Sequence, residues 1–358
     1  MDRQVCNHEI IETTLKTIAT ILASILLLTW DSPGQSTATD VSKVGTSAAT
    51  YLEIPVGAPA IAMGGAFVSV ANDATALYWN PAGIALIPRN EVVAVHTNWI
   101  ADTKFDFGAF VLPLGDFGAL GFSFTSLSMA DMKVRTVEQQ EGTGEYFSAV
   151  DLAAGISYAR KLSDRFAIGF TGKYLQQSIW HEKASAFAID AGTSFRTDLL
   201  GGIVIGATLT NFGTAMQLSG RDTRQFIRID PTKTGSNDRI PADIEMQAWD
   251  LPLQFQFGVS TNIINNENYR WAVAVDAMHP SDNFGSMNIG TEFAYLNIIF
   301  LRGGFQSLFL DDAEGGFSFG VGLASGSLSK DLGLKFDYAF RDMGRLQSIH
   351  TFSLGVVF

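Results

Sequence analysis

The chain has 358 residues, of which 47% are hydrophobic and only 17% are charged, below the roughly 25% of an average soluble protein. Its formal net charge of −12 gives no basic surface, so we expect no nucleic-acid partner. The single cysteine, Cys6, excludes a disulfide framework and a cysteine-rich metal site.

The first 38 residues have the pattern of a targeting segment. An apolar stretch at 17–30 follows Lys16 and precedes small residues at 36–38. This stretch is shorter than the roughly 20 residues of a spanning helix and suits the core of a signal peptide. We therefore predict a signal peptide over residues 1–38, with cleavage near Ala38. An anchoring helix is the alternative.

Residues 39–90 are rich in small side chains and contain short helix signals. Asn72 and Asp73 are suitable caps for a helix over 74–79, and Asn80 followed by Pro81 is typical of the start of another helix. We interpret residues 39–90 as an N-terminal plug, or hatch, for the structure that follows.

The remainder of the chain, residues 91–358, alternates apolar with small or polar side chains at the period of a β-strand. The clearest example is 251–259, in which every odd position is apolar. The pattern predicts fourteen strands, an even number as in bacterial single-chain barrels. They lie near 91–98, 104–113, 117–127, 146–160, 165–177, 184–196, 201–210, 251–260, 270–277, 286–296, 298–305, 315–324, 331–340 and 348–358.

The lengths of the connections alternate as well. Gaps after odd-numbered strands include the longest two, at 128–145 and 211–250, whereas gaps after even-numbered strands are mostly short. Outer-membrane barrels have long loops outside the cell and short periplasmic turns. A soluble sandwich has no reason to sort its loops in this way. The predicted fold is therefore all-β, a fourteen-stranded antiparallel transmembrane barrel with a plug in its lumen, surrounded by outer-membrane lipid.

A set of charged residues is predicted to face the lumen, opposite the apolar stripe of each strand. The ordinary interpretation is a solvated or mutually paired interior, and the functional one is a permeation path or contacts that grip the plug. Arg302 interrupts an apolar run and needs a partner, for which Glu292 is the candidate. The set comprises Asp106, Asp151, Lys173, Asp190, Arg196, Asp276, Glu292, Arg302, Lys335 and Asp337.

The last strand ends on Phe358. A terminal aromatic strand resembles the sorting signal by which the barrel-assembly machinery recognises outer-membrane proteins. The resemblance implies the outer membrane of a Gram-negative-type bacterium.

Patterns of catalysis are weak. Ser318 lies in a Gly-x-Ser-x-Gly sequence, but that motif requires a strand-to-helix turn, and this serine is predicted inside a strand. The histidines lack metal-site spacing. We expect no enzyme activity, no metal and no cofactor.

The stretch 60–84 resembles the plug of the FadL superfamily of fourteen-stranded barrels and is most similar to the PorV/PorQ branch. The matching elements, in order, are Met63, Gly64, Gly65, Asn72, Asp73, Trp79, Asn80, Pro81 and Ala82. The resemblance implies a role in type IX secretion, with delivery of secreted cargo proteins to the surface. The alternative that it implies is FadL-like passive transport of long-chain fatty acids or other small hydrophobic molecules.

Overall fold

The computed structural model describes residues 43–199, 202–230, 232–235, 237, 239–310, 313, 315–325 and 332–358. The signal peptide predicted over residues 1–38 lies outside this part of the chain. No helix among the described residues has the length and apolarity needed to cross a membrane.

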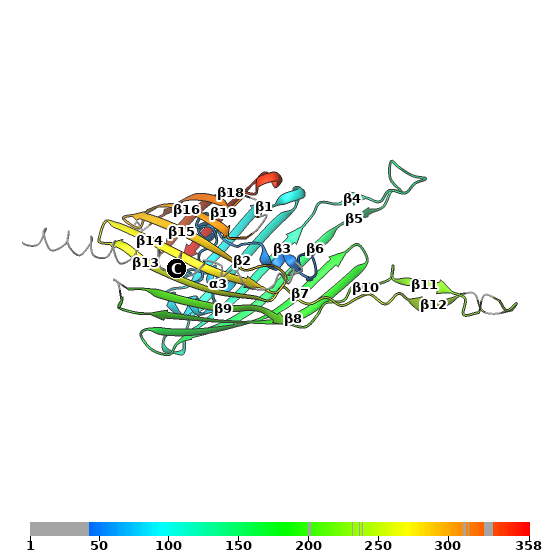
Figure 1. The fold of residues 1–358 in the computed structure, drawn as a ribbon, viewed down its shortest axis with the longest axis horizontal. Helices are drawn as coiled ribbons and strands as arrows, with labels where there is room; N and C mark the ends of the chain where they lie inside the picture. The colour runs from blue at the N-terminus through cyan, green and yellow to red at the C-terminus, as the bar shows by residue number, and fades with distance from the viewer. Residues whose placement is uncertain are drawn as a thin grey trace, which may run out of the picture. The chain divides into compact units, whose positions relative to one another are not determined.

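Fourteen strands of the described chain form one antiparallel sheet that closes on itself (Figure 1). The first and last strands are neighbours, with Glu91 opposite Val357, and pairing of β8 with β9 completes the ring. Closure therefore leaves no edge of the sheet exposed to lipid. The fourteen predicted strands are confirmed, with shifted ends. They are β1 (Glu91–Asn98), β2 (Lys104–Pro113), β3 (Ala119–Ser128), β6 (Ala149–Lys161), β7 (Phe166–Ile179), β8 (Glu182–Arg196), β9 (Val204–Gly213), β13 (Gln254–Asn265), β14 (Tyr269–Pro280), β15 (Ser286–Tyr295), β16 (Ile299–Leu308), β17 (Phe317–Ala324), β18 (Gly333–Asp342) and β19 (Ser348–Val357).

Two hairpins project from the end of the barrel that carries the long connections (Figure 1). The first contains β4 (Met132–Lys133) and β5 (Tyr146–Phe147). The second contains β11 (Arg224–Ile227) and β12 (Ile240–Asp243), and it follows β10 (Ser219–Gly220), which pairs with β8. We call this end the long-loop end and the opposite end the short-turn end. The predicted asymmetry of the connections is therefore present. Short 3-10 turns lie in three other connections: η3 (Ile100–Asp102), η4 (Gly115–Phe117) and η7 (Gly344–Leu346).

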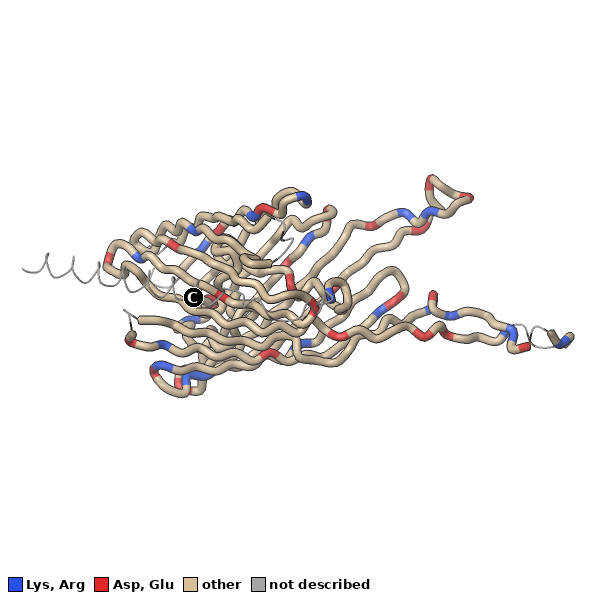
Figure 2. The backbone as a smooth tube through the Cα atoms, viewed as in Figure 1, with Lys and Arg blue, Asp and Glu red and all other residues tan. Residues whose placement is uncertain are grey.

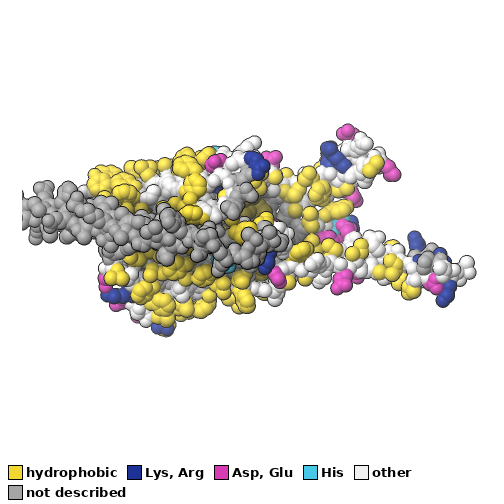
Figure 3. Space-filling model, viewed as in Figure 1, with side chains coloured by type: hydrophobic (Ala, Val, Ile, Leu, Met, Phe, Trp, Pro, Cys, Tyr) yellow, Lys and Arg dark blue, Asp and Glu magenta, His cyan; other side chains and the backbone are white. Residues whose placement is uncertain are grey.

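The outer wall of the barrel is apolar. Large side chains on alternate strand positions are exposed, among them Phe122, Phe187, Leu301, Phe336 and Leu354. Figure 3 shows hydrophobic side chains over the visible wall, and Figure 2 shows most charges at turns and along the hairpins. Such a surface would aggregate in water and is expected only where lipid covers it.

Residues 43–90 lie inside the ring and are called the lumen segment. Their short elements contact inward-facing residues of strands on opposite sides of the barrel: α2 contacts β16–β19, and η2 contacts β6–β8. A segment that touches both sides of a closed sheet from within occupies its interior. The elements are η1 (Thr50–Glu53), α2 (Ala58–Ala62), α3 (Ala76–Trp79) and η2 (Pro81–Leu86).

The lumen segment makes the interior of one wall apolar, and this overturns one prediction. Phe105 and Phe107 are buried against the lumen segment's core, so Asp106 between them points outward. It pairs with His96 on β1, Nδ1 to Oδ1 2.7 Å. The assignment of Asp106 to the lumen was wrong because both faces of β2 carry apolar residues, and alternation alone does not say which face meets lipid.

Candidate functional site

The Met63–Gly65 turn of the lumen segment lies against the backbone of β15 and β16. Gly64 has a φ of +65°, and a Cβ there would lie 2.6 Å from the backbone nitrogen of Phe305. Only glycine combines this left-handed conformation with so close an approach. The Met63 carbonyl meets the strand glycines Gly290 and Gly304, where side chains are absent. The turn is therefore fitted to the wall.

The Trp79–Ala82 element bonds the lumen segment both internally and to the opposite wall. Trp79 Nε1 donates to the carbonyl of Val56 at 2.7 Å. Asn80 caps η2 as predicted: its Oδ1 accepts from the Ala82 N–H at 3.1 Å, with Pro81 in the first position. Its Nδ2 donates to the carbonyls of Val68 at 2.9 Å and of Thr193 on β8 at 3.0 Å. One buried amide thus satisfies three backbone groups.

Pro81 fits against β7 and β8 because both strands carry glycine where it approaches. A Cβ on Gly169 would lie 2.6 Å from the Ala82 nitrogen, and one on Gly192 would lie 2.7 Å from Pro81 Cδ. These distances leave no room for a side chain. The wall is shaped for this turn.

The predicted cap at Asn72–Asp73 differs in detail. The helix α3 begins at Ala76, two residues later than predicted, and Asp73 Oδ1 instead accepts from the Thr75 N–H at 2.9 Å. Asp73 therefore closes a turn before the helix. Asn72 is exposed at this turn.

Asp276 anchors the lumen segment to β14. Its Oδ2 accepts from the backbone N–H groups of Phe67 and Val68, at 2.8 and 2.9 Å, and the side chain is fully buried. Charge-assisted bonds of this kind are stronger than neutral ones. This charge was predicted in the lumen and grips the segment there.

Arg302 lies at the centre of a buried ion-pair cluster. Its Nε is 2.5 Å from Glu292 Oε2, and its Nη1 is 2.6 Å from Asp337 Oδ1. Arg270 also pairs with Glu292. The predicted pairing of Arg302 with Glu292 is confirmed. Two arginines and two carboxylates compensate one another, which fits a structural role.

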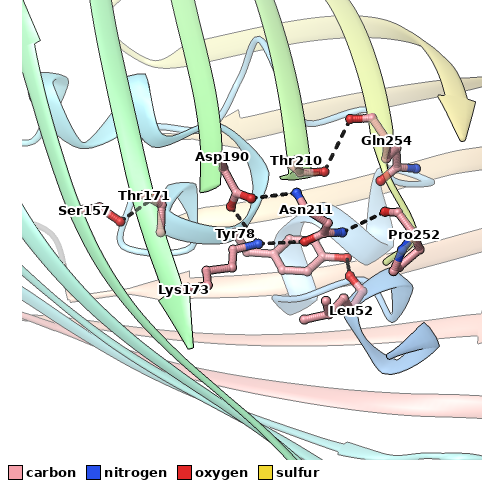
Figure 4. A network of polar contacts seen from close by, with 10 residues as sticks. All are labelled: Leu52, Tyr78, Ser157, Thr171, Lys173, Asp190, Thr210, Asn211, Pro252 and Gln254. Carbon is pink, nitrogen blue, oxygen red and sulfur yellow. Dashed lines mark hydrogen bonds and ion pairs between the residues drawn. The ribbon is translucent and has the colours of Figure 1, made fainter. Parts of the chain in front are cut away.

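A second network lies on the opposite wall, below the long-loop end (Figure 4). Lys173 Nζ contacts Asp190 Oδ2 at 2.6 Å and donates to Asn211 Oδ1 at 2.9 Å. Asn211 has a φ of +62°, at a register shift between β8 and β9, so its N–H donates to Asp190 Oδ1 at 2.8 Å. Its Nδ2 donates to the Pro252 carbonyl at 3.0 Å. The hydrogen bonds of Asn211 to Lys173, Asp190 and Pro252 thus stabilise the register shift between β8 and β9.

The remaining predicted charges are more loosely placed. Lys335 contacts Glu91 at 3.6 Å. Asp151 is half-buried on the inward side of β6, and Arg196 is exposed at the end of β8. These three do not join either network. Ser318 is a buried lumen residue, whose hydroxyl donates to the carbonyls of Ala62 and Gly304 at 3.2 and 3.4 Å.

A pocket of about 330 Å³ remains between the lumen segment and strands β13–β16, towards the long-loop end. We call it the lumen pocket. Its lining mixes polar and apolar groups and includes five side-chain amides, one arginine and two acids: Gln254, Gln256, Asn283, Asn288, Gln306, Arg341, Glu53 and Asp282. Partial burial and, secondarily, the carboxylate of Asp282 raise the pKa of Glu53 to about 7. The pocket suits a polar occupant better than an apolar one.

Sequence reasoning missed these pocket residues. Arg341 continues the inward alternation of Lys335, Asp337 and Ala339, but the predicted strand ended at 340. Extending that strand by one residue would have found it. Glu53 ends the one-turn helix η1 and Asp282 lies in the connection between β14 and β15, and both segments are too short for periodicity to indicate direction.

Fold and site together define an outer-membrane β-barrel of fourteen strands whose lumen holds the chain's own N-terminal segment. Solved structures support this class. The chain shares its fold with the Pseudomonas putida toluene transporter TodX (TM-score 0.52, 16% identity, 84% of this chain and 97% of that one). A Pseudomonas aeruginosa FadL homologue gives a TM-score of 0.50 at 12% identity, over 85% and 98% of the two chains.

The toluene transporter TbuX of Ralstonia pickettii is similar to the same degree, with a TM-score of 0.51 at 14% identity over 84% and 97% of the chains. A comparison with curated protein sequences finds no match. The model of the family described as "Type IX secretion system protein PorV" matches residues 37–278, more than half of the chain. The protein therefore belongs to the PorV family and is an outer-membrane barrel related to type IX secretion.

Proposed function

We propose that the protein holds exported polypeptides at the cell surface through its long-loop end, while the lumen segment stays in place as a plug. The family match carries this proposal. It is supported by a lumen segment that is hydrogen-bonded to β8 through Asn80 and to β14 through Asp276. A barrel whose interior is fixed in this way can bind proteins at its surface but does not provide a transport channel.

The two projecting hairpins are the proposed contact surface. Val137 is 91% exposed on the first, and Phe226 and Ile229 are 68% and 73% exposed on the second. Apolar side chains presented beyond the lipid-facing wall are typical of surfaces that another protein covers. Their flanking charges (Figure 2) keep the hairpins soluble between binding events.

Site-specific photo-cross-linking in cells tests this proposal. A photoreactive residue at Phe226 or at Val137 is expected to capture secreted proteins. The matched control is Phe117, an equally bulky side chain that is 76% exposed in a connection at the short-turn end. Equal capture at Phe117, or no secreted protein captured at the hairpins, would contradict the proposal.

Passive passage of hydrophobic compounds is the alternative, favoured by the shared fold with the toluene transporters. The lumen pocket argues against it, because its lining is rich in amides and charges. Deletion of the gene tests the alternative directly: it predicts loss of growth on long-chain fatty acids, whereas the secretion role predicts unchanged growth and loss of surface proteins.

A further inference from the structure

One buried cation of the barrel wall lacks the compensation that the others have. Arg302 and Lys173 each contact a carboxylate within 2.6 Å. Arg341 on β18 is only 9% exposed, yet no carboxylate of the described residues pairs with it, and its buried Nε has no hydrogen-bond partner. Leaving a buried charge uncompensated costs several kcal/mol. A buried ionisable group without a partner in the lumen of a barrel is therefore a candidate for a functional site.

Arg341 lines the lumen pocket, so the missing partner has a place to bind. A volume of about 330 Å³ lies at the lower end of the range for small-molecule sites. A guanidinium binds carboxylates through two parallel hydrogen bonds. The unsatisfied group therefore selects an anion, and a planar one in particular.

The rest of the lining narrows the ligand further. Gln254, Gln256, Asn283 and Gln306 supply both donors and acceptors, as a peptide group requires. Asp282 is buried, with Oδ2 accepting from Ser47 but Oδ1 without a partner. This oxygen therefore has an unused acceptor position. The pocket thus has a cationic wall and an acidic wall with amides around them.

We propose that the lumen pocket binds a carboxylate that carries nearby N–H donors, with Arg341 holding the carboxylate and Asp282 accepting from an N–H group. Both a polypeptide with a free carboxyl group and a free amino acid present this chemistry. The assignment rests on Arg341 and its surroundings and stands independently of the secretion role.

The test measures binding by calorimetry to the full-length protein in detergent. The probes are N-acetyl-glycyl-glycine, the same compound as its C-terminal amide, and free glycine. The acid is expected to bind at least about tenfold more tightly than the amide, because only the acid offers an anion to Arg341. Tighter binding of the acetylated dipeptide would indicate a polypeptide ligand, and tighter binding of glycine a free amino acid.

Variants connect the preference to the residue. Arg341→Gln is expected to lose the acid-over-amide preference, while Arg341→Lys retains part of it because the charge remains. Arg165→Gln, which removes an exposed arginine at the short-turn end, is the matched control and is expected to bind like wild type. Heat-modifiable mobility on gels verifies that each barrel is folded, and Arg341→Lys keeps the test valid if the glutamine variant does not fold.

Three results would overturn the proposal: equal affinity for acid and amide, an unchanged preference in folded Arg341→Gln, or no binding of either carboxylate probe up to about 10 mM.

Discussion

Arg302 and Arg341 lie on nearby strands of the same wall, face the same lumen and have opposite surroundings. Arg302 contacts two carboxylates, one of them shared with Arg270. Arg341 is similarly buried, but no carboxylate in the described part of the chain pairs with it, and it lines a pocket. Burial of a charge is therefore not in itself a sign of function. A compensated charge stabilises the fold, whereas an uncompensated one beside an empty volume is available to a ligand.

The largest expected effect comes from breaking the compensated cluster. Glu292→Gln removes the carboxylate that Arg270 and Arg302 share, so the buried Arg302 and the half-buried Arg270 each lose a partner. We expect a loss of about 3–5 kcal/mol in the free energy of unfolding. Thermal unfolding in detergent, followed by heat-modifiable mobility, measures it. Glu141→Gln, in the exposed β4–β5 hairpin, is the control, and similar stability of both variants would refute a structural role for the cluster.

A second effect concerns the hydrogen bonds of the lumen segment. Asn80→Ala removes the cap of η2 and the bonds to Val68 and Thr193. We expect a loss of about 2–4 kcal/mol and faster proteolysis of the lumen segment. Asn80→Ser keeps a capping oxygen and should recover part of the loss. Wild-type protease resistance of Asn80→Ala would show that the wall holds the segment without this residue.

Arg341→Met and Arg302→Met are expected to change the stability of the barrel in opposite directions. Replacing an uncompensated buried charge by an apolar side chain of similar length is expected to stabilise the barrel by about 1–3 kcal/mol. Arg302→Met should destabilise it, since Asp337 would then lose its partner. Unfolding of the two variants side by side gives the answer. The same sign for both would end the distinction between the two arginines.

The smallest effect is a dependence of stability on pH. In the folded protein the pKa of Glu53 is about 7, against 4.5 ordinarily, so the folded state binds more protons between these values. Its contribution to the free energy of unfolding is therefore full below about pH 4.5 and declines as the pH rises to 7. Glu53→Gln should flatten the profile in this window. An identical profile for variant and wild type would exclude Glu53 as its source.

Much of the fold could be predicted because strand alternation and loop length are local properties of the sequence. The ion pair of Arg302 with Glu292 could also be predicted from the sequence, since an arginine inside an apolar strand must have a partner on an adjacent strand. The outward position of Asp106 could not be predicted from the sequence. Which face of β2 turns toward the lumen depends on the lumen segment, which makes part of the interior as apolar as lipid.

The lumen pocket was the feature that the sequence predicted least. It exists where the lumen segment fails to fill the barrel, and its acids lie in segments without periodicity. No local pattern in the sequence indicates where a pocket will remain between the lumen segment and the barrel wall. The proposed sorting role of Phe358 and the signal peptide at 1–38 stay predictions.

A reversible disulfide between the lumen segment and the barrel wall tests whether this segment stays in place as a plug while exported proteins are delivered. A Cβ on Gly290 would lie 2.8 Å from Met63 Cβ and 2.3 Å from the Met63 carbonyl oxygen. A shift of the turn away from the strand by roughly 1 Å relieves this contact and brings a Met63→Cys/Gly290→Cys pair into disulfide geometry, in a Cys6→Ser background. The two single-cysteine variants are the controls. If the segment is a fixed plug, surface delivery of exported proteins is the same in the oxidised pair as in the controls. Delivery that stops on oxidation and returns with reductant would contradict the account.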